Sequence, residues 1–189
     1  VVSGFVNFSV KDDYLRRRID VLFNSDESVY HTAEEKARRV LLEFVSSNPT
    51  GPLHIGHARC AAIGDSLRRL FETLGCRVET EYYVNDAGNQ TELLKNSVEA
   101  RVNELKGIKS EFPGNGYRGG YVYDIAKKII EAQISGPDGI KKTAVEFMLS
   151  DIREDLKSFD IRIDGYFFES SIAGEVNKLL EKVTKEGLA

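Results

Sequence analysis

One stretch of the chain constrains the fold more than any other, because it combines a buried strand, a turn, a long helix and a second strand in that order. Residues 40–45 form a short apolar run with β-branched side chains, followed by a turn rich in serine, proline and glycine, which is typical of a central parallel strand. Residues 78–84 alternate in polarity and are rich in Tyr and Val, which predicts the second strand. Together these elements form one βαβ unit and predict an α/β fold with a parallel sheet.

The helix between these strands is predicted from apolar residues at spacings of three and four. It is expected to begin near residues 55–57 and to end at Gly75, since glycine often stops helices. Charged side chains occupy its other face, so the apolar stripe is expected to face the core. The stripe consists of Ile63, Leu67, Leu70, Phe71 and Leu74.

The segments that follow continue the alternation of helices and strands. Helical periodicity and apolar runs predict helices over 87–105, 121–134, 140–159 and 173–186 and a strand over 166–170. Residues 107–120 contain five glycines and one proline and are expected to form a surface loop or a small insertion. The predicted buried stripe of the third helix is Ala144, Phe147, Met148, Ile152, Leu156 and Phe159.

The N-terminal segment is expected to be the end of a domain whose beginning is absent. Residues 5–10 alternate as in a strand, and residues 11–18 favour a helix. One strand and one helix cannot bury enough surface to fold alone. Residues 1–23 are therefore interpreted as the tail of a preceding domain, with a hinge near residues 24–26.

Composition excludes several classes of protein. The 26 Lys and Arg against 30 Asp and Glu give a net charge of −4, so a nucleic-acid partner must be met by a local basic patch. No apolar stretch of about 18 residues occurs, and the N-terminus lacks a signal-peptide pattern. A soluble cytoplasmic protein without a membrane partner is therefore expected. Cys60 and Cys76 are expected to be reduced thiols, because no cysteine or histidine cluster accompanies them.

Two histidines lie three residues apart where the first strand leads into the helix. The first N–H groups of a helix are unpaired and its dipole is positive there, so His54 and His57 would donate hydrogen bonds to phosphate oxygens at an anion-binding position. Gly56 has no Cβ, which would let a nucleotide approach the backbone. A pair of solvated or core-bound histidines is the alternative. A zinc site is not expected here, and His31 is expected on the surface.

Asp86, Asn89 and Gln90 follow the second strand, at the edge where open α/β sheets bind ligands. Asp86 would equally serve as the N-cap of the next helix.

The basic clusters at 16–18 and 38–39 would contact RNA phosphates or form a solvated surface, and the sequence leaves both open. Tyr117 and Tyr121, in the glycine-rich loop, are equally undecided.

The four residues His54-Ile55-Gly56-His57 form the HIGH signature of class I aminoacyl-tRNA synthetases, and residues 43–53 (EFVSSNPTGPL) resemble arginyl-tRNA synthetases of the bacterial type. Further similarity lies in Gly64-Asp65, in residues 82–90 (YYVNDAGNQ) and in residues 117–121 (YRGGY). The signature alone is weak, because small adenylyltransferases share His-x-Gly-His. Together the motifs are specific, and the resemblance covers nearly the whole chain.

The resemblance implies a two-step reaction in protein biosynthesis: ATP activates L-arginine to arginyl-adenylate, and the arginyl group then moves to tRNA(Arg). ATP with Mg²⁺ would be a substrate complex, without a tightly bound metal, and the full-length ligase would be a monomer. By motif position, His54 and His57 would be the catalytic residues, and His54, Gly56 and His57 would bind ATP. The residues implied for arginine are Glu43, Ser46, Ser47, Asn48 and His57.

Physical chemistry supports the role that the resemblance implies for Glu43. A guanidinium is a planar, permanently charged group that a carboxylate recognises through two parallel hydrogen bonds. Glu43 is the acid in an otherwise apolar strand, where a buried charge is costly unless a cation pairs with it. The alternative is a side chain that points into solvent or bonds the neighbouring backbone.

The sequence also departs from the family pattern, because the Lys-Met-Ser-Lys-Ser signature of class I synthetases does not occur in it. We therefore expect a fragment: residues 24–189 as the first half of a Rossmann-like, doubly wound parallel catalytic domain with helical segments, incomplete and nearly inactive alone. Two alternatives stay open. One is a free-standing adenylyltransferase of the same superfamily, and the other is a non-catalytic RNA-binding or partner module.

Overall fold

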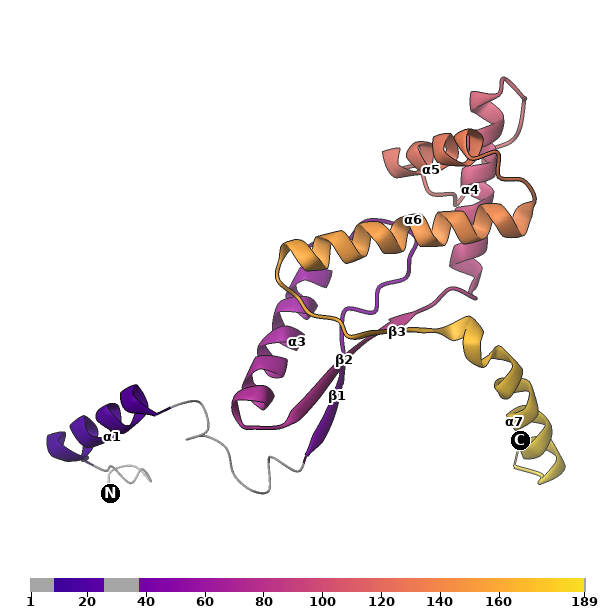
Figure 1. Cartoon of the computed structure of the whole chain (residues 1–189). Helices are drawn as coiled ribbons and strands as arrows, with labels where there is room; N and C mark the ends of the chain where they lie inside the picture. Colours follow the sequence, from indigo (N-terminus) through magenta and orange to yellow (C-terminus); the bar gives the residue numbers. More distant parts are fainter. Residues whose placement is uncertain (1–8, 26–37, 189) are drawn as a thin grey trace, which may run out of the picture. The chain divides into compact units, whose positions relative to one another are not determined.

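The computed structural model describes residues 9–25 and 38–188. Most of the predicted strand over 5–10 lies outside the described residues, and so does His31. The chain divides into two compact units, one formed by Val1–Val40 with Arg68–Val78 and the other by Leu41–Leu67 with Glu79–Ala189. The first unit contains helix α1 (Asp12–Asn24; Figure 1). This helix is longer than the predicted 11–18 and buries none of its residues.

A three-stranded sheet confirms the predicted α/β fold (Figure 1). Its strands are β1 (Arg39–Glu43), β2 (Arg77–Val84) and β3 (Gly165–Phe168), in the order β1-β2-β3. Strands β2 and β3 are parallel, with Val84 opposite Phe168. Strand β1 is hydrogen-bonded to β2, and just beyond its end the Phe44 N–H donates to the Glu81 carbonyl at 3.4 Å.

The position of β1 differs from the prediction in one respect. It is an edge strand of the described sheet rather than a central one, and Leu41 is 60% exposed. An apolar run predicts that a strand is covered on both faces, but it does not show which segments cover it. The strand also ends at Glu43, because Val45 and Ser46 adopt positive φ values of 68° and 40° that a strand cannot continue.

The predicted helices all form, with bounds shifted by a few residues. Their bounds are α3 (Ile55–Thr73), α4 (Asn89–Leu105), α5 (Gly120–Glu131), α6 (Pro137–Ser158) and α7 (Ala173–Lys185). The predicted strand over 166–170 ends at Phe168, and a short 3₁₀ helix, η2 (Glu169–Ile172), precedes α7. The segment between α4 and α5 is a loop, as predicted.

The predicted orientation of α3 is wrong for the described residues. Ile63, Leu67 and Leu70 are 42–61% exposed, and Leu74 is 41% exposed, whereas Ala61, Gly64, Asp65 and Arg68 are buried. The buried face includes Ala61 and Gly64, whose small size lets α3 approach the end of β1 closely. A Cβ built on Gly64 would lie 2.2 Å from the Phe44 ring. Helical periodicity located the helix but not the face that meets the sheet.

This close approach gives a first prediction. Replacing Gly64 with alanine is expected to destabilise the chain by about 1–3 kcal/mol, because the Phe44 ring must move to admit the methyl group. Urea denaturation of the two proteins measures the change. Gly120→Ala is the control, since a Cβ there meets nothing within 4 Å. Equal stabilities of Gly64→Ala and Gly120→Ala would contradict this packing.

Helix α6 belongs to two hydrophobic cores and connects them (Figure 1). Ala144 and Met148 pack with residues of α4 and α5, and Leu149 and Ile152 pack with β2 and α3. The predicted stripe is confirmed at Ala144, Met148, Ile152 and Leu156, which are all buried. It is wrong at Phe159, which is 72% exposed. Phe159 lies after the end of α6, where it lines an apolar cavity of about 470 Å³ beside the start of α3.

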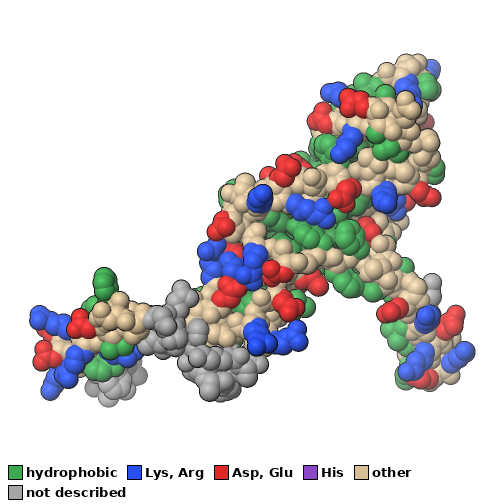
Figure 2. Space-filling view, in the orientation of Figure 1, with side chains coloured by type: hydrophobic (Ala, Val, Ile, Leu, Met, Phe, Trp, Pro, Cys, Tyr) green, Lys and Arg blue, Asp and Glu red, His purple; other side chains and the backbone are tan. Residues whose placement is uncertain are grey.

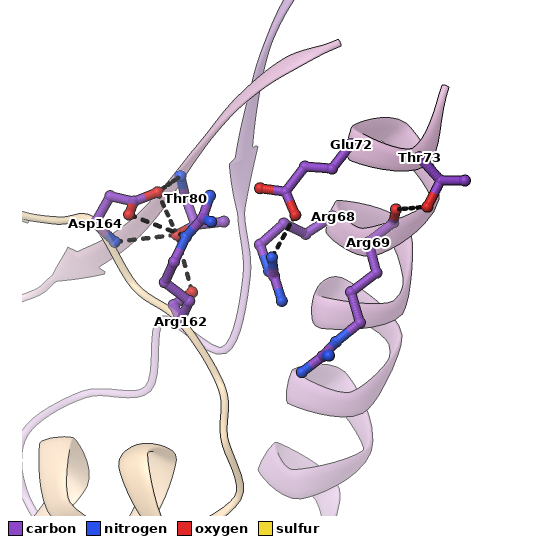
Figure 3. A network of polar contacts seen from close by, with 7 residues as sticks. All are labelled: Arg68, Arg69, Glu72, Thr73, Thr80, Arg162 and Asp164. Atoms are coloured by element: carbon purple, nitrogen blue, oxygen red, sulfur yellow. Dashed lines mark hydrogen bonds and ion pairs between the residues drawn. The ribbon is translucent and has the colours of Figure 1, made fainter. Parts of the chain in front are cut away.

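A polar contact fixes the start of β3 against β2 (Figure 3). Thr80 is 1% exposed, its N–H donates to Asp164 Oδ2 at 2.9 Å, and its hydroxyl accepts from the Asp164 N–H at 3.0 Å. Burial raises the pKa of Asp164, but the Thr80 hydrogen bonds and the nearby Arg162 outweigh it, so the net pKa is lowered. In the same view, Arg68 of α3 pairs with Glu72 one turn later at 2.5 Å.

The surface of the described residues is mixed in charge. On the face shown in Figure 2, basic and acidic side chains lie interspersed over α6 and over the region of α4 and α5. Arg16, Arg17 and Arg18 are exposed on α1. Within the described residues, no helix combines the length and apolarity needed to cross a membrane.

Candidate functional site

The predicted site residues lie at the carboxyl ends of β1 and β2 and in the loop that leads from β1 into α3. Near its start, this loop contains two non-glycine residues at positive φ, Val45 and Ser46. Such a conformation is strained for a β-branched residue, and it persists only where surrounding contacts hold it. The contacts of the loop therefore decide which side chains it presents.

Glu43 and Ser46 are brought together at the end of β1. The Ser46 hydroxyl donates to Glu43 Oε1 and also accepts the Tyr83 N–H at 3.1 Å. Ser46 thus fixes the Glu43 carboxylate beside β2. Glu43 is exposed rather than buried, so the expectation of a buried carboxylate is wrong. Exposed and half-buried residues alternate along β1, so Glu43 lies with Arg39 and Leu41 on the face of the strand that the described residues leave open to solvent.

Asn48 is held by the start of α4. Its side-chain amide donates to Gln90 Oε1 at 2.8 Å, and its carbonyl accepts the Thr50 N–H at 2.8 Å. The Ser47 hydroxyl lies 3.5 Å from the Asn48 carbonyl, and the Ser47 carbonyl accepts the Tyr82 hydroxyl at 2.7 Å. Burial raises the pKa of Tyr82, which keeps this hydroxyl protonated as a donor.

The two histidines form a reciprocal cap at the start of α3. His54 Nδ1 accepts the Gly56 N–H at 3.1 Å, and His57 Nδ1 accepts the His54 N–H at 3.2 Å. In a capping box, the side chain of the N-cap residue accepts an N–H of the first turn, and the side chain of the third helical residue accepts the N–H of the N-cap residue. His54 and His57 make this pair of hydrogen bonds. The spacing of three residues follows from this geometry. The imidazole rings stack, with centroids 3.7 Å apart and planes at 16°.

This cap determines the tautomer of both rings. Because each Nδ1 accepts a backbone N–H, the proton of each neutral imidazole is on Nε2. Burial, and secondarily the charge of His54, lowers the pKa of His57 below 6.5. At neutral pH, His57 is therefore an uncharged Nε2–H donor at a helix N-terminus.

The lowered pKa gives a second prediction. The His57 imidazole is expected to titrate below pH 6.5, and replacing His54 with glutamine should raise the His57 pKa by removing the neighbouring charge. Above pH 6.5 the ring is neutral in both folded and unfolded chains. As the pH falls below 6.5 the unfolded chain takes up the proton first, so the folded state loses stability until the folded pKa is passed. NMR titration of the Cε1–H signals measures both values; a His57 pKa of 6.5 or above would contradict the prediction.

The fold requires a glycine at position 56 for a second reason, besides the expected approach of a nucleotide. A Cβ at this position would lie 2.9 Å from His54 Cε1. The glycine therefore admits the folded-back ring of His54 over the first turn of α3.

Asp86 does not cap the next helix. Gly88 is the N-cap residue of α4, and the Asp86 carboxylate instead accepts the Ser170 N–H at 2.9 Å and the Ser170 hydroxyl at 2.6 Å. The parallel register brings the ends of β2 and β3 side by side, which places Ser170 within reach. Asn89 is exposed in the first turn of α4.

Two tyrosines that hold the loop were not assigned to it from the sequence. Tyr82 reaches the Ser47 carbonyl, and the Tyr121 hydroxyl donates to the Thr50 carbonyl at 2.9 Å. The alternation of β2 puts Tyr82 on its buried face, and a buried tyrosine hydroxyl needs a hydrogen-bond partner. The sequence therefore indicated that Tyr82 bonds a polar group. Among the described residues, no group of three or more His, Cys, Asp or Glu side chains could hold a metal ion.

Comparison with known proteins gives concordant matches. Residues 19–155 match the family model described as tRNA synthetases class I (R), catalytic domain. An arginine–tRNA ligase of Staphylococcus carnosus is 36% identical over 97% of this chain, and one of Desulfovibrio desulfuricans is 39% identical over 97%. The chain spans 35% of the length of each of these relatives.

A solved structure from Campylobacter jejuni, described as an arginyl-tRNA synthetase, shares this fold. The two structures superpose with a TM-score of 0.72 at 36% sequence identity. The match covers 93% of this chain and 40% of the Campylobacter jejuni chain.

Proposed function

Because this chain belongs to the arginyl-tRNA synthetases of class I, we propose that it supplies the signature-bearing part of the site at which an arginine–tRNA ligase activates arginine with ATP. In this proposal the ligase forms arginyl-adenylate, releases pyrophosphate and transfers the arginyl group to tRNA(Arg). Residues 24–189 belong to its catalytic domain, and residues 1–23 are the end of a tRNA-binding domain.

The observation that carries the proposal is the state of the histidine pair. The backbone occupies both Nδ1 atoms, so His54 and His57 keep their Nε2–H groups for a ligand at the N-terminus of α3. Negative charge develops on the α-phosphate when the arginine carboxylate attacks it. Preorganised N–H donors and the positive helix end stabilise that charge.

Arginine would bind along the loop after β1. Glu43 is an exposed carboxylate fixed by the Ser46 hydroxyl, and a carboxylate suits the planar guanidinium of the substrate. Ser46, Ser47 and Asn48 would serve its α-amino and carboxylate groups, with His57 at the junction to the phosphate site. ATP enters as a Mg²⁺ complex that belongs to the substrate.

Titration calorimetry of L-arginine into the chain tests the proposal, with ornithine and lysine as matched ligands that carry an ammonium instead of a guanidinium. Selective binding of arginine is expected, because the paired hydrogen bonds to a carboxylate require the planar group. A chain that bound none of the three ligands, or all three equally, would contradict the arginine site.

A further inference from the structure

The loop that presents the proposed arginine ligands is held by a helical region far away in the sequence. The contact between Tyr121 of α5 and Thr50 spans 71 residues, and Gln90 of α4 holds Asn48 in the same loop. Helices α4 and α5 pack on each other and on α6 through their own hydrophobic core. The loop is therefore fixed to a separately packed group of helices as well as to the sheet.

We propose that the Tyr121 hydroxyl is a positioning group for arginine activation, which fixes the Thr50 carbonyl and through it the backbone that carries Asn48. This inference rests on the proposed function, because it assigns Tyr121 a task only if the loop binds arginine. Tyr121 is a positioning residue and is not placed in contact with substrate.

The surroundings of Tyr121 favour a specific role for the hydroxyl over incidental packing. Thr50 is 7% exposed, so its carbonyl has little access to water and depends on the tyrosine for a donor. The Thr50 N–H bonds the Asn48 carbonyl at 2.8 Å, which couples the two residues directly. Burial, reinforced by Tyr117, raises the pKa of Tyr121 and keeps its hydroxyl protonated.

Two glycines lie against the Tyr121 side chain. A Cβ on Gly51 would lie 3.2 Å from the Tyr121 hydroxyl oxygen, and a Cβ on Gly119 would lie 2.3 Å from its ring. The first glycine belongs to the loop and the second is the N-cap residue of α5. A side chain at Gly119 would therefore overlap the ring, and one at Gly51 would crowd its hydroxyl.

The test compares Tyr121→Phe with Tyr123→Phe, which removes a neighbouring tyrosine hydroxyl that bonds Glu104 and does not touch the loop. Three properties are measured: the thermal midpoint, amide hydrogen exchange of residues 47–57, and the affinity for L-arginine. Tyr121→Phe is expected to speed exchange in residues 47–57 and to weaken arginine binding about five- to tenfold, as expected for one lost neutral hydrogen bond. Tyr123→Phe should change neither property.

Thermal midpoints separate positioning from a loss of stability, because arginine affinity should fall in Tyr121→Phe even where both variants melt together. Unchanged exchange in residues 47–57, or an arginine affinity equal to that of the unchanged chain, would overturn the role of Tyr121. If the unchanged chain binds no arginine, the proposed function fails, and the exchange rates still decide whether Tyr121 fixes the loop.

Discussion

Replacing Glu43 with alanine is expected to weaken the affinity for L-arginine on the order of 100-fold, since the guanidinium loses its charged, hydrogen-bonding partner. The carboxylate is exposed and fixed by the Ser46 hydroxyl, which itself bonds the backbone of β2. The substitution therefore removes the ligand without opening a core. Titration calorimetry with L-arginine measures the change.

Two further variants sharpen this measurement. Glu43→Gln keeps an oxygen acceptor for Ser46 but has no negative charge, so its arginine affinity is expected to lie between those of the unchanged chain and Glu43→Ala. Glu131→Ala removes an exposed acid from the end of α5 and should leave the affinity unchanged. Unaltered arginine binding by Glu43→Ala would remove Glu43 from the site.

Loss of the His57 imidazole is the second large effect we expect. In arginine-dependent exchange of labelled pyrophosphate into ATP by the full-length ligase, His57→Ala should lower kcat about 10²–10³-fold, the usual cost of deleting a preorganised donor to developing negative charge. The alanine also leaves the His54 N–H without its acceptor, so a lower stability should accompany the loss.

His57→Asn separates these two effects. The asparagine side-chain oxygen can replace Nδ1 as acceptor for the His54 N–H, but no atom reaches the position of Nε2. We expect His57→Asn to recover stability and to remain as slow as His57→Ala. A variant that recovered the exchange rate together with stability would show that His57 acts through the helix cap alone.

Local pattern was sufficient to predict the elements of the fold. The βαβ order, the helices after β2 and the parallel sheet depend on periodicity and turn residues that lie within short windows. The position of His54 and His57 at a helix start was equally local, because the strand ends and the helix begins within the same segment.

Features that depend on distant partners could not be predicted in the same way. The apolar stripe of α3 lies outward, because the ring of Phe44, the residue after β1, meets Gly64 on the other face. Asp86 bonds Ser170 instead of capping α4, because β2 and β3 end side by side only in the folded sheet. The Tyr121 contact with Thr50 joins residues too distant in the sequence for any local pattern to pair.

The double packing of α6 has a consequence for how this region unfolds. Adjacent faces of one helix complete the core of α4 and α5 and the core of the sheet, so neither core keeps its full cover if α6 detaches. The two should melt in a single cooperative step instead of peeling apart. Helices α4 and α5 therefore cannot be deleted without cost. Their removal would uncover Ala144 and Met148 on α6, and the sheet still requires α6 for its own core.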